Sequence, residues 1–190
     1  MKIITKEEFL ENKEFYLNEM HAGKIFIYPT DTIYGIGCDA TNKSAVLKVR
    51  EIKHRDEKPF SVIAPSKDLI KKNCHVEYHG EKWIAKLPGA YTLILELRNW
   101  EAVDSKTNCG LDNLGVRIPD NWFSAIIGEF GKPFVTTSVN LSGEKPMASV
   151  EDCNPSIADK VDYIIDDGVL AGKPSTIVKL LHGDEEIIKR

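Results

Sequence analysis

The segment from 25 to 59 holds the residues of this chain that are best suited to chemistry on an anionic substrate. Its first half is a glycine-punctuated loop with hydroxyl or carboxylate side chains at Thr30, Asp31, Thr32 and Tyr34. Its second half is a basic cluster of Lys53, Arg55 and Lys58. A guanidinium binds two oxygens in a fork and an ammonium acts as a point charge, so the cluster suits a polyanion such as a triphosphate. We therefore expect this segment to form the centre of an active site.

The same cations also fit a second interpretation, as the solvated end of a helix. Positive charge there complements the carbonyl pole of the helix dipole. The chain returns to the core at once through 59–63, however, and this favours cations held beside a sheet edge over cations on a free surface. The two interpretations differ in whether the cations face a hollow or bulk solvent.

A second polar segment, 136–143, closes a predicted strand with the sequence Thr-Thr-Ser-Val-Asn-Leu-Ser-Gly. Turn chemistry explains the final Ser-Gly but not the hydroxyls and the amide that precede it. A similar Ser-Thr pair at 175–176 opens a later predicted strand. Both segments are further candidates for contacts to substrate.

Other routes to nucleotide chemistry fit this sequence poorly. Gly35, Gly37 and Ala40 match the spacing of the dinucleotide fingerprint, but a polar loop precedes them and the next helix begins only near Asn42. There is no P-loop sequence, no kinase signature and no Gly-x-Ser-x-Gly elbow. Cys74, His75 and His79 lack a second ligand pair at metal spacing, so we expect no metal ligands from protein side chains.

Composition indicates one globular domain over 1–190, in a cytoplasmic protein. The chain is 42% hydrophobic with a formal charge of −4, which argues against indiscriminate coating of nucleic acid. Its four cysteines, with no Cys-x-x-Cys pair, suggest free thiols in a reducing compartment. The N-terminus lacks the apolar run of a signal peptide, and no segment reaches membrane-spanning length.

The spacing of apolar residues predicts an α/β fold, a mixed sheet with flanking helices. Helices are expected at 6–21, from Asn42 to about 52, after Ser66, at 122–130 and after Ser149, and a further apolar segment of unassigned type lies at 83–87. Strands are expected at 24–28, 60–64, 91–97, 114–118, 133–139, 161–165, 176–181 and 186–189.

Six segments, in order, resemble the YrdC family, the L-threonylcarbamoyladenylate synthases. They are Pro-Thr-Asp-Thr-Ile-Tyr-Gly-Ile-Gly at 29–37, Lys-x-Arg at 53–55 with Lys-Pro at 58–59, Leu-Pro-Gly-Ala-Tyr-Thr at 87–92, Gly-Val-Arg-Ile-Pro at 115–119, Ser-Val-Asn-Leu-Ser-Gly at 138–143 and Ser-Thr-Ile-Val at 175–178. The resemblance covers nearly the full length of the chain.

The resemblance implies a YrdC-like twisted mixed sheet with flanking helices and a large, basic concave face. It implies an enzyme that makes threonylcarbamoyl-AMP and pyrophosphate from L-threonine, bicarbonate or CO2, and ATP with Mg2+. The product would serve the threonylcarbamoyladenosine modification of tRNA through a downstream transferase complex. Direct binding of tRNA or double-stranded RNA is a further implied property.

The resemblance also implies roles for residues at matching positions. Lys53 and Arg55 would be catalytic. Threonine or its carbamate would contact Thr32, Tyr34, Arg117 and Ser138. The nucleotide would contact Lys53, Arg55, Lys58, Thr92, Asn140, Ser142, Ser175, Thr176 and Arg190.

Some positions depart from the family pattern, and two alternative functions stay open. Ala90 replaces a proline, Val139 replaces an alanine, and the segment between Arg55 and Pro59 is about one residue shorter than the commonest form. The chain ends at Arg190, so we expect no extra C-terminal domain of the kind that longer members carry. The alternatives are a non-catalytic module for double-stranded RNA or tRNA, and a related enzyme that forms carbamoyl-adenylate.

Overall fold

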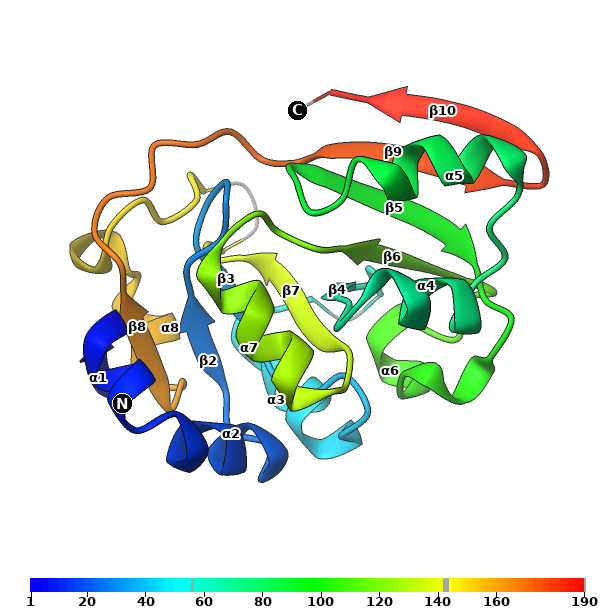
Figure 1. Cartoon of the computed structure of the whole chain (residues 1–190). Helices are drawn as coiled ribbons and strands as arrows, with labels where there is room; N and C mark the ends of the chain where they lie inside the picture. The colour runs from blue at the N-terminus through cyan, green and yellow to red at the C-terminus, as the bar shows by residue number, and fades with distance from the viewer. Residues whose placement is uncertain (56, 142–143, 190) are drawn as a thin grey trace.

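The computed structural model describes residues 1–55, 57–141 and 144–189. Its strands form one ten-stranded mixed sheet in the order β1-β8-β2-β3-β7-β4-β6-β5-β9-β10 (Figure 1). The strand bounds are β1 Lys2–Thr5, β2 Phe26–Tyr28, β3 Gly35–Gly37, β4 Ser61–Ile63, β5 Tyr91–Glu96, β6 Asn113–Arg117, β7 Phe134–Ser138, β8 Tyr163–Asp166, β9 Thr176–Leu181 and β10 Asp184–Ile188.

Helices flank this sheet, and most begin where the sequence offers a capping side chain. Thr5, Asn42 and Ser66 each accept a hydrogen bond from a backbone N–H of the first turn that follows. The α-helices are α1 Lys6–Glu11, α2 Lys13–His21, α3 Lys43–Lys53, α4 Lys67–Asn73, α5 Tyr78–Ala85, α6 Ser105–Asn108, α7 Trp122–Phe130 and α8 Pro155–Ala158, and the 3₁₀ turns are η1 Trp100–Ala102 and η2 Val150–Asp152.

The prediction of one helix over 6–21 is wrong at its middle. The chain leaves helical geometry at Asn12, with φ −114° and ψ 29°, and α2 begins at the next residue. The Asn12 side chain donates to the carbonyl of Glu8 at 3.0 Å. An asparagine side chain that bonds a nearby backbone carbonyl in this way competes with helix continuation.

Two strands, β1 and β3, were not predicted, and β3 matters most for the site. Its sequence, Gly-Ile-Gly, has little intrinsic preference for a strand. Gly37 lies so close to β7 that a Cβ atom there would sit 1.7 Å from the carbonyl oxygen of Val135. Because β3 pairs antiparallel with both β2 and β7, the polar loop 29–34 is fixed at their ends, and Gly35 lies opposite Ser138.

Two apolar clusters pack on opposite faces of the sheet. Ile27 belongs to the first cluster, whereas its neighbours Phe26 and Tyr28 belong to the second, as strand alternation requires. Helices α3, α4, α5 and α8 contribute side chains to the first cluster. The second cluster receives side chains from α1, α2 and α7 and reaches β4 through Ile63. On the same face of the sheet, the described apolar side chains of α1, α2 and α7 do not extend past β4 to β6, β5 and β9.

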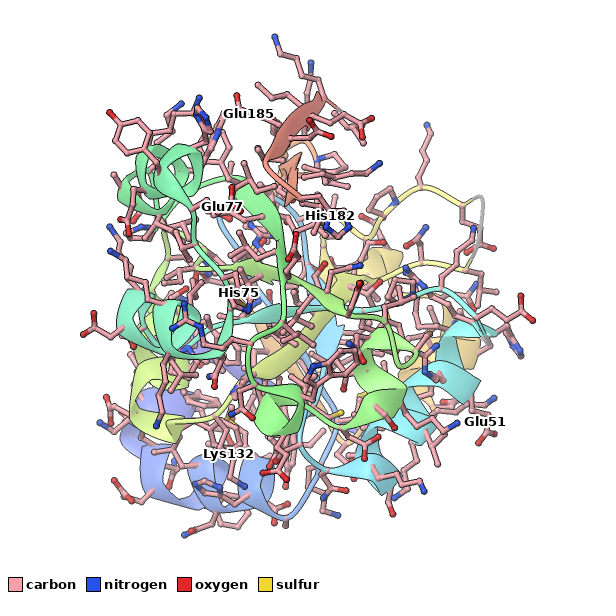
Figure 2. The ribbon with its side chains drawn as sticks, turned by 90° about the vertical axis from the view of Figure 1, so that its right-hand side faces the viewer. Glu51, His75, Glu77, Lys132, His182 and Glu185 are labelled. Carbon is pink, nitrogen blue, oxygen red and sulfur yellow. The ribbon has the colours of Figure 1, made fainter. Side chains whose placement is uncertain are left out.

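The far end of the sheet is closed by the β9–β10 hairpin, which packs against α5. Trp83 of α5 donates from its indole nitrogen to Glu185 of β10 at 3.0 Å, and Lys82 forms an ion pair with the same carboxylate at 2.7 Å. At the hairpin turn, His182 lies 3.0 Å from Glu96 of β5. Figure 2 shows His182 and Glu185 at this end of the molecule, far from Lys132. These contacts fix the position of β9.

The close approach of β3 to β7 predicts opposite effects for two Gly→Ala substitutions. Gly37→Ala should lower the free energy of unfolding by about 3 kcal/mol, because the new methyl group overlaps a backbone carbonyl that cannot move without breaking the sheet. Gly128→Ala, on the exposed side of α7, should raise it by up to about 1 kcal/mol because alanine favours the helix. Urea unfolding of both variants tests this. Equal effects of the two changes would contradict the packing described for β3.

Candidate active site

A cavity of about 340 Å³ lies over the part of the sheet that the helices leave uncovered. Its floor is a row of residues that strand register places side by side. Ser61 pairs with Thr136 of β7 on one side and with Gly115 of β6 on the other, and Gly115 pairs with Ile94 of β5. A side chain at position 115 would fill this floor, since its Cβ would lie 2.4 Å from the Ser61 hydroxyl.

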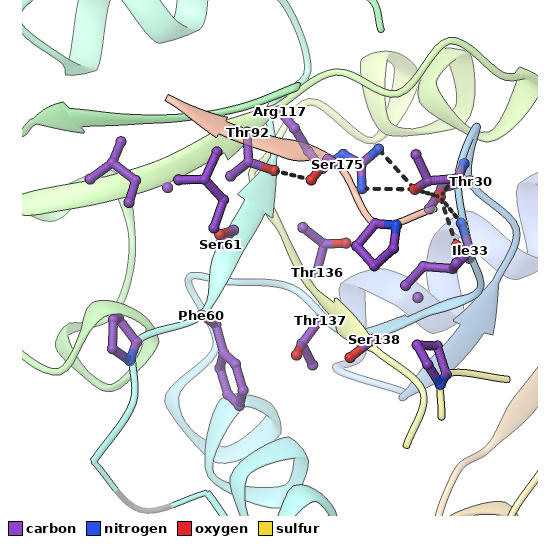
Figure 3. Close-up of a pocket in the computed structure, with 18 of the residues that line it drawn as sticks. Thr30, Ile33, Phe60, Ser61, Thr92, Arg117, Thr136, Thr137, Ser138 and Ser175 are labelled. Carbon is purple, nitrogen blue, oxygen red and sulfur yellow. Dashed lines mark hydrogen bonds between the residues drawn. The ribbon is translucent and has the colours of Figure 1, made fainter. Parts of the chain in front are cut away.

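The walls of the cavity gather polar groups from segments that are far apart in the chain (Figure 3). They include two arginines, and among the described residues that line the cavity there is no carboxylate. The sequence-predicted residues that line it are Thr32, Tyr34, Arg55, Thr92, Arg117, Ser138 and Ser175. The loop before β3, Arg55 of the basic cluster and the end of β7 therefore face one hollow, whereas Lys53 and Lys58 are not among the residues that line it.

Arg55 is a half-buried cation that has no carboxylate partner in the part of the chain that the structure describes. Its Nη1 donates to the hydroxyl of Thr137 at 3.2 Å and its Nη2 to the carbonyl of Pro59 at 2.7 Å. Its Nε is buried and has no hydrogen-bond partner among the described residues. Burial, and to a smaller extent the nearby charge of Arg50, lowers the pKa of the Arg55 guanidinium, which nevertheless stays protonated. A buried donor and an uncompensated charge make this end of the cavity receptive to an anion.

Arg117 differs from Arg55 because it already has a carboxylate partner. Its Nη2 lies 2.5 Å from Oδ1 of Asp31, and both side chains are about nine-tenths buried. The Thr32 hydroxyl accepts from the same guanidinium at 3.4–3.5 Å, and Asp31 also accepts from the backbone N–H of Asp120 at 3.0 Å. The fork of Arg117 is thus fixed in place, and its charge is balanced by Asp31.

The loop 29–34 is a hydrogen-bonded turn organised by Thr30. The Thr30 hydroxyl accepts from the N–H groups of Thr32 and Ile33, at 3.1 and 3.2 Å, and lies 2.9 Å from the Thr32 hydroxyl. This turn holds Thr32 against both Arg117 and the cavity. Thr30 therefore lines the cavity and also positions its neighbour.

A long segment crosses over this loop and completes the wall. The Tyr34 hydroxyl donates to the carbonyl of Gly168 at 2.8 Å and accepts from the N–H of Asp167 at 3.0 Å, and burial raises its pKa. Gly172 packs so tightly that a Cβ there would lie 2.1 Å from the carbonyl oxygen of Thr32. Beyond it, the hydroxyls of Ser175 and Thr92 lie 2.7 Å apart at the cavity.

Lys53 is buried beside the cavity without lining it. Its ammonium donates to the carbonyls of Ser138 and Asn140 and, at 3.3 Å, to the amide oxygen of Asn140. Ser138 in turn donates to the same amide oxygen at 2.5 Å. Burial, followed by the charge of Arg55, lowers the pKa of Lys53 to about 8, although Glu144 opposes the shift. The structure thus places Lys53 as a tie between α3 and the end of β7.

Comparisons with known proteins place the chain in a family. The sequence model of the Sua5/YciO/YrdC family, which is described as "Telomere recombination", matches residues 18–190. The chain belongs to the Sua5/YciO/YrdC family. The predicted resemblance is confirmed.

Two relatives and one solved structure show how far this likeness extends. A candidate threonylcarbamoyl-AMP synthase of Methanocaldococcus jannaschii is 39% identical over 190 residues, which cover 97% of this chain and 87% of the relative. The threonylcarbamoyl-AMP synthase of Vibrio parahaemolyticus is 31% identical over 176 residues, covering 88% of this chain and 94% of that protein. P. abyssi Sua5 complexed with L-threonine is 25% identical, with a TM-score of 0.85 over the whole of this chain.

The fold class predicted from the sequence is confirmed by these structures. The E. coli YciO structure matches with a TM-score of 0.86 at 22% identity, which shows a shared fold alone. This chain spans 57% of the P. abyssi Sua5 chain and 95% of the YciO chain.

Other residues predicted from the Sua5/YciO/YrdC resemblance lie away from the cavity wall. Lys58 is exposed, and the structure uses its backbone carbonyl as an acceptor for Arg50 at 3.2 Å. Thr176 begins β9, where its N–H donates to the carbonyl of Ala90. Asn140 bonds Lys53, Ser138 and its own loop but does not line the cavity. Ser142 and Arg190 lie outside the described residues.

Sequence reasoning assigned no site role to several cavity residues, although a signal for some of them was present. Ser61 is an isolated hydroxyl in an otherwise apolar strand, and Gly115 lies two residues before Arg117 on the same face of β6. Period-two alternation with Arg117 and Thr92 would have placed Gly115 and Ile94 on the cavity floor. The pairing of Asp31 with Arg117 joins residues 86 apart and has no local signal.

Neither a metal-binding cluster nor a membrane-spanning helix is found in the described part of the chain. No cluster of three or more His, Cys, Asp or Glu side chains within it could hold a metal ion. Within the same residues, no helix is both long enough and apolar enough to cross a bilayer.

The lowered pKa of Lys53 predicts how stability depends on pH. In the unfolded chain the amine keeps its proton up to about its ordinary pKa of 10.5, whereas the folded protein releases it near 8. Between these values the unfolded state binds more protons, so stability rises with pH there. Wild type should therefore gain stability relative to Lys53→Met as the pH increases from 7 to 10, measured by urea unfolding. A constant difference between the two proteins would show that Lys53 titrates normally.

Proposed function

We propose that the protein is a threonylcarbamoyl-AMP synthase, which makes threonylcarbamoyl-AMP and pyrophosphate from L-threonine, bicarbonate or CO2, and ATP. The observation that carries the proposal is a cavity in which Arg55, a cation with no carboxylate partner among residues 1–55, 57–141 and 144–189, shares one hydroxyl-rich space with the fixed guanidinium of Arg117. Two anions must meet in this reaction, and the cavity offers each of them a cation. The names of relatives that match nearly the whole chain support the same activity.

In the proposed reaction, the free amine of threonine first attacks CO2 and releases a proton to water, giving a carbamate. A carbamate oxygen then attacks the α-phosphorus of ATP, the bond from that phosphorus to the β-phosphate bridging oxygen breaks, and pyrophosphate leaves. Both reacting partners are negative, so the protein's task is to position them and to balance their charge. No side chain of the cavity wall is needed as a general base if threonine enters as the free amine.

We assign the phosphates to the Arg55 end of the cavity. The buried Nε of Arg55 lacks an acceptor, and its charge lacks a carboxylate partner among the described residues. A phosphate oxygen supplies both. The hydroxyls of Ser138, Thr137 and Thr136 border the same space and give further donors for the nucleotide or the carbamate.

We assign threonine to the end where Thr32 and Arg117 meet. The guanidinium there is oriented by Asp31, which leaves a rigid donor set for a small carboxylate. The P. abyssi structure is described as complexed with L-threonine, which supports threonine as a ligand of this fold. Thr92 of β5 is the cross-strand neighbour of Arg117, and its hydroxyl, with that of Ser175, adds hydrogen-bonding groups beside this guanidinium.

Magnesium fits this site as part of the nucleotide substrate. The described cavity wall carries no carboxylate that would hold Mg2+ directly, and this ion is commonly bound through substrate phosphates and water. When bound, it would neutralise charge on the phosphates. We propose a cytoplasmic enzyme whose product is consumed by a transferase that modifies tRNA. Binding of tRNA or double-stranded RNA stays a prediction.

The activity is tested by incubating the protein with MgATP, bicarbonate and labelled threonine. Pyrophosphate release should depend on threonine, and the label should appear in a mixed anhydride with AMP. Release that is independent of threonine would contradict the proposed function. Carbamoyl phosphate in place of threonine and bicarbonate tests for the related carbamoyl-adenylate activity, which we expect to be absent.

Arg55→Ala should reduce turnover by about 10²–10³-fold, the usual effect of removing one preorganised donor to developing charge. The variant should remain folded, because among the described residues the lost group contacts Thr137, Pro59 and the Phe60 ring and leaves no carboxylate there unpaired. Arg98→Ala, which removes the same side chain from an exposed position outside the cavity, is the matched control and should retain wild-type turnover. Steady-state kinetics at saturating threonine measures both, and equal activity of the two variants would contradict the role of Arg55.

A further inference from the structure

Arg50 is a buried arginine for which the proposed reaction has no direct use. It lies on α3 one turn before Lys53, and only 5% of it is exposed. Its Nε donates to the carbonyl of Lys106 at 2.7 Å, and its Nη2 donates to the carbonyl of Thr107 at 3.3 Å and to the sulfur of Cys109 at 3.0 Å. One side of the fork is therefore anchored on α6 and the residue that ends it.

The other side of the fork holds the loop that carries Arg55. Nη1 of Arg50 donates to the carbonyl of Arg55 at 2.8 Å and to the carbonyl of Lys58 at 3.2 Å. Both carbonyls belong to the segment that connects α3 to β4. A single planar group thus links this connection, at two points, to α6.

Phe60 adds a second link between the two arginines. The guanidinium carbon of Arg50 lies 4.6 Å from the centre of the Phe60 ring, and that of Arg55 lies 5.3 Å from the same centre. Phe60 is itself buried, lines the cavity and donates from its N–H to the carbonyl of Thr107. Arg50, Phe60 and α6 therefore form one support beneath Arg55.

We propose that Arg50 is the positioning residue for Arg55: its fork fixes the backbone around Arg55 so that this side chain is already in place when the phosphates bind. The inference rests on the proposed function in one respect, that a nucleotide phosphate is the ligand of Arg55. The role requires an arginine. Five donors in a rigid plane reach several segments at once, whereas a lysine directs all its donors from a single nitrogen.

The size of the expected effect follows from the geometry of such supports. A misplacement of about 1 Å away from the chemistry can reduce rate about 10²-fold. Arg50→Lys keeps the charge and loses the fork, so it should weaken MgATP binding and raise the KM for ATP by about 10- to 100-fold. The KM for threonine should change less than about twofold, because Arg117 and Thr32 are held by Asp31 and Thr30 instead.

The test is a double-mutant cycle on MgATP affinity, measured at equilibrium without threonine. If Arg50 acts through Arg55, the combined Arg50→Lys and Arg55→Lys variant should bind ATP no more weakly than Arg55→Lys alone. Cys109→Ala removes one contact of Arg50 but leaves both loop carbonyls, and it should bind ATP as wild type does. Effects that multiply in the combined variant, or a folded Arg50→Lys with wild-type ATP affinity, would overturn the proposal.

A measurement on the wild-type protein covers the case in which Arg50→Lys does not fold. In ¹⁵N–¹H spectra of arginine Nε groups, pyrophosphate should shift the Arg55 resonance and leave that of Arg50 unmoved and protected from exchange. An Arg50 Nε–H that exchanges as fast as that of exposed Arg98 would overturn the proposal. None of these measurements needs turnover. If the wild-type protein binds ATP but shows no threonine-dependent pyrophosphate release, the proposed function is rejected, and the binding measurements still test the role of Arg50.

Discussion

The Arg55 side chain lies half-buried beside a polar cavity, with its Nε fully buried and no carboxylate partner among the described residues, and the surrounding site is organised around that imbalance. Removing an ion from water costs several kcal/mol unless other groups compensate. Here, neutral oxygens of Thr137 and Pro59 and the ring of Phe60 compensate in part. An anionic ligand completes the compensation. The free energy that the ligand-free protein loses by removing Arg55 from water is thus recovered when a phosphate binds, and this recovery favours binding.

The sheet explains how two guanidinium groups of opposite character face one space. Arg117 extends from β6 and is balanced by Asp31 of the loop before β3, whereas Arg55 extends from the connection between α3 and β4. Strand register brings β4, β6 and β7 side by side, and small residues on their shared face leave room for substrate. The side chains at both ends of the cavity are thus held in place before substrate binds. The Arg117 end has its charge balanced, and the Arg55 end is positive. This difference in charge explains how an amino acid and a triphosphate could each bind at its own end of one cavity.

Much of the fold and site was predictable because the signals were local. Capping residues and apolar periodicity located α3, α7 and most strands, and the polar loop 29–34 and the basic cluster were identified as parts of one site. The break at Asn12 and the strand β3 were missed, since both depend on contacts that override local preference. The grouping of Lys53 with Arg55 as phosphate ligands stays a prediction, and in the structure Lys53 bonds backbone and amide oxygens of 138–140. Charge spacing predicts that cations gather but not which oxygens they bind.

A crystal structure with threonine and a non-hydrolysable ATP analogue tests the central claim most directly. The account predicts phosphate oxygens at Nε of Arg55, threonine between Thr32 and Arg117, and the two ligands in one continuous cavity over β4, β6 and β7. Phosphates bound elsewhere, for example in the groove between α3 and α6 that Leu47 and Leu111 line, would contradict it.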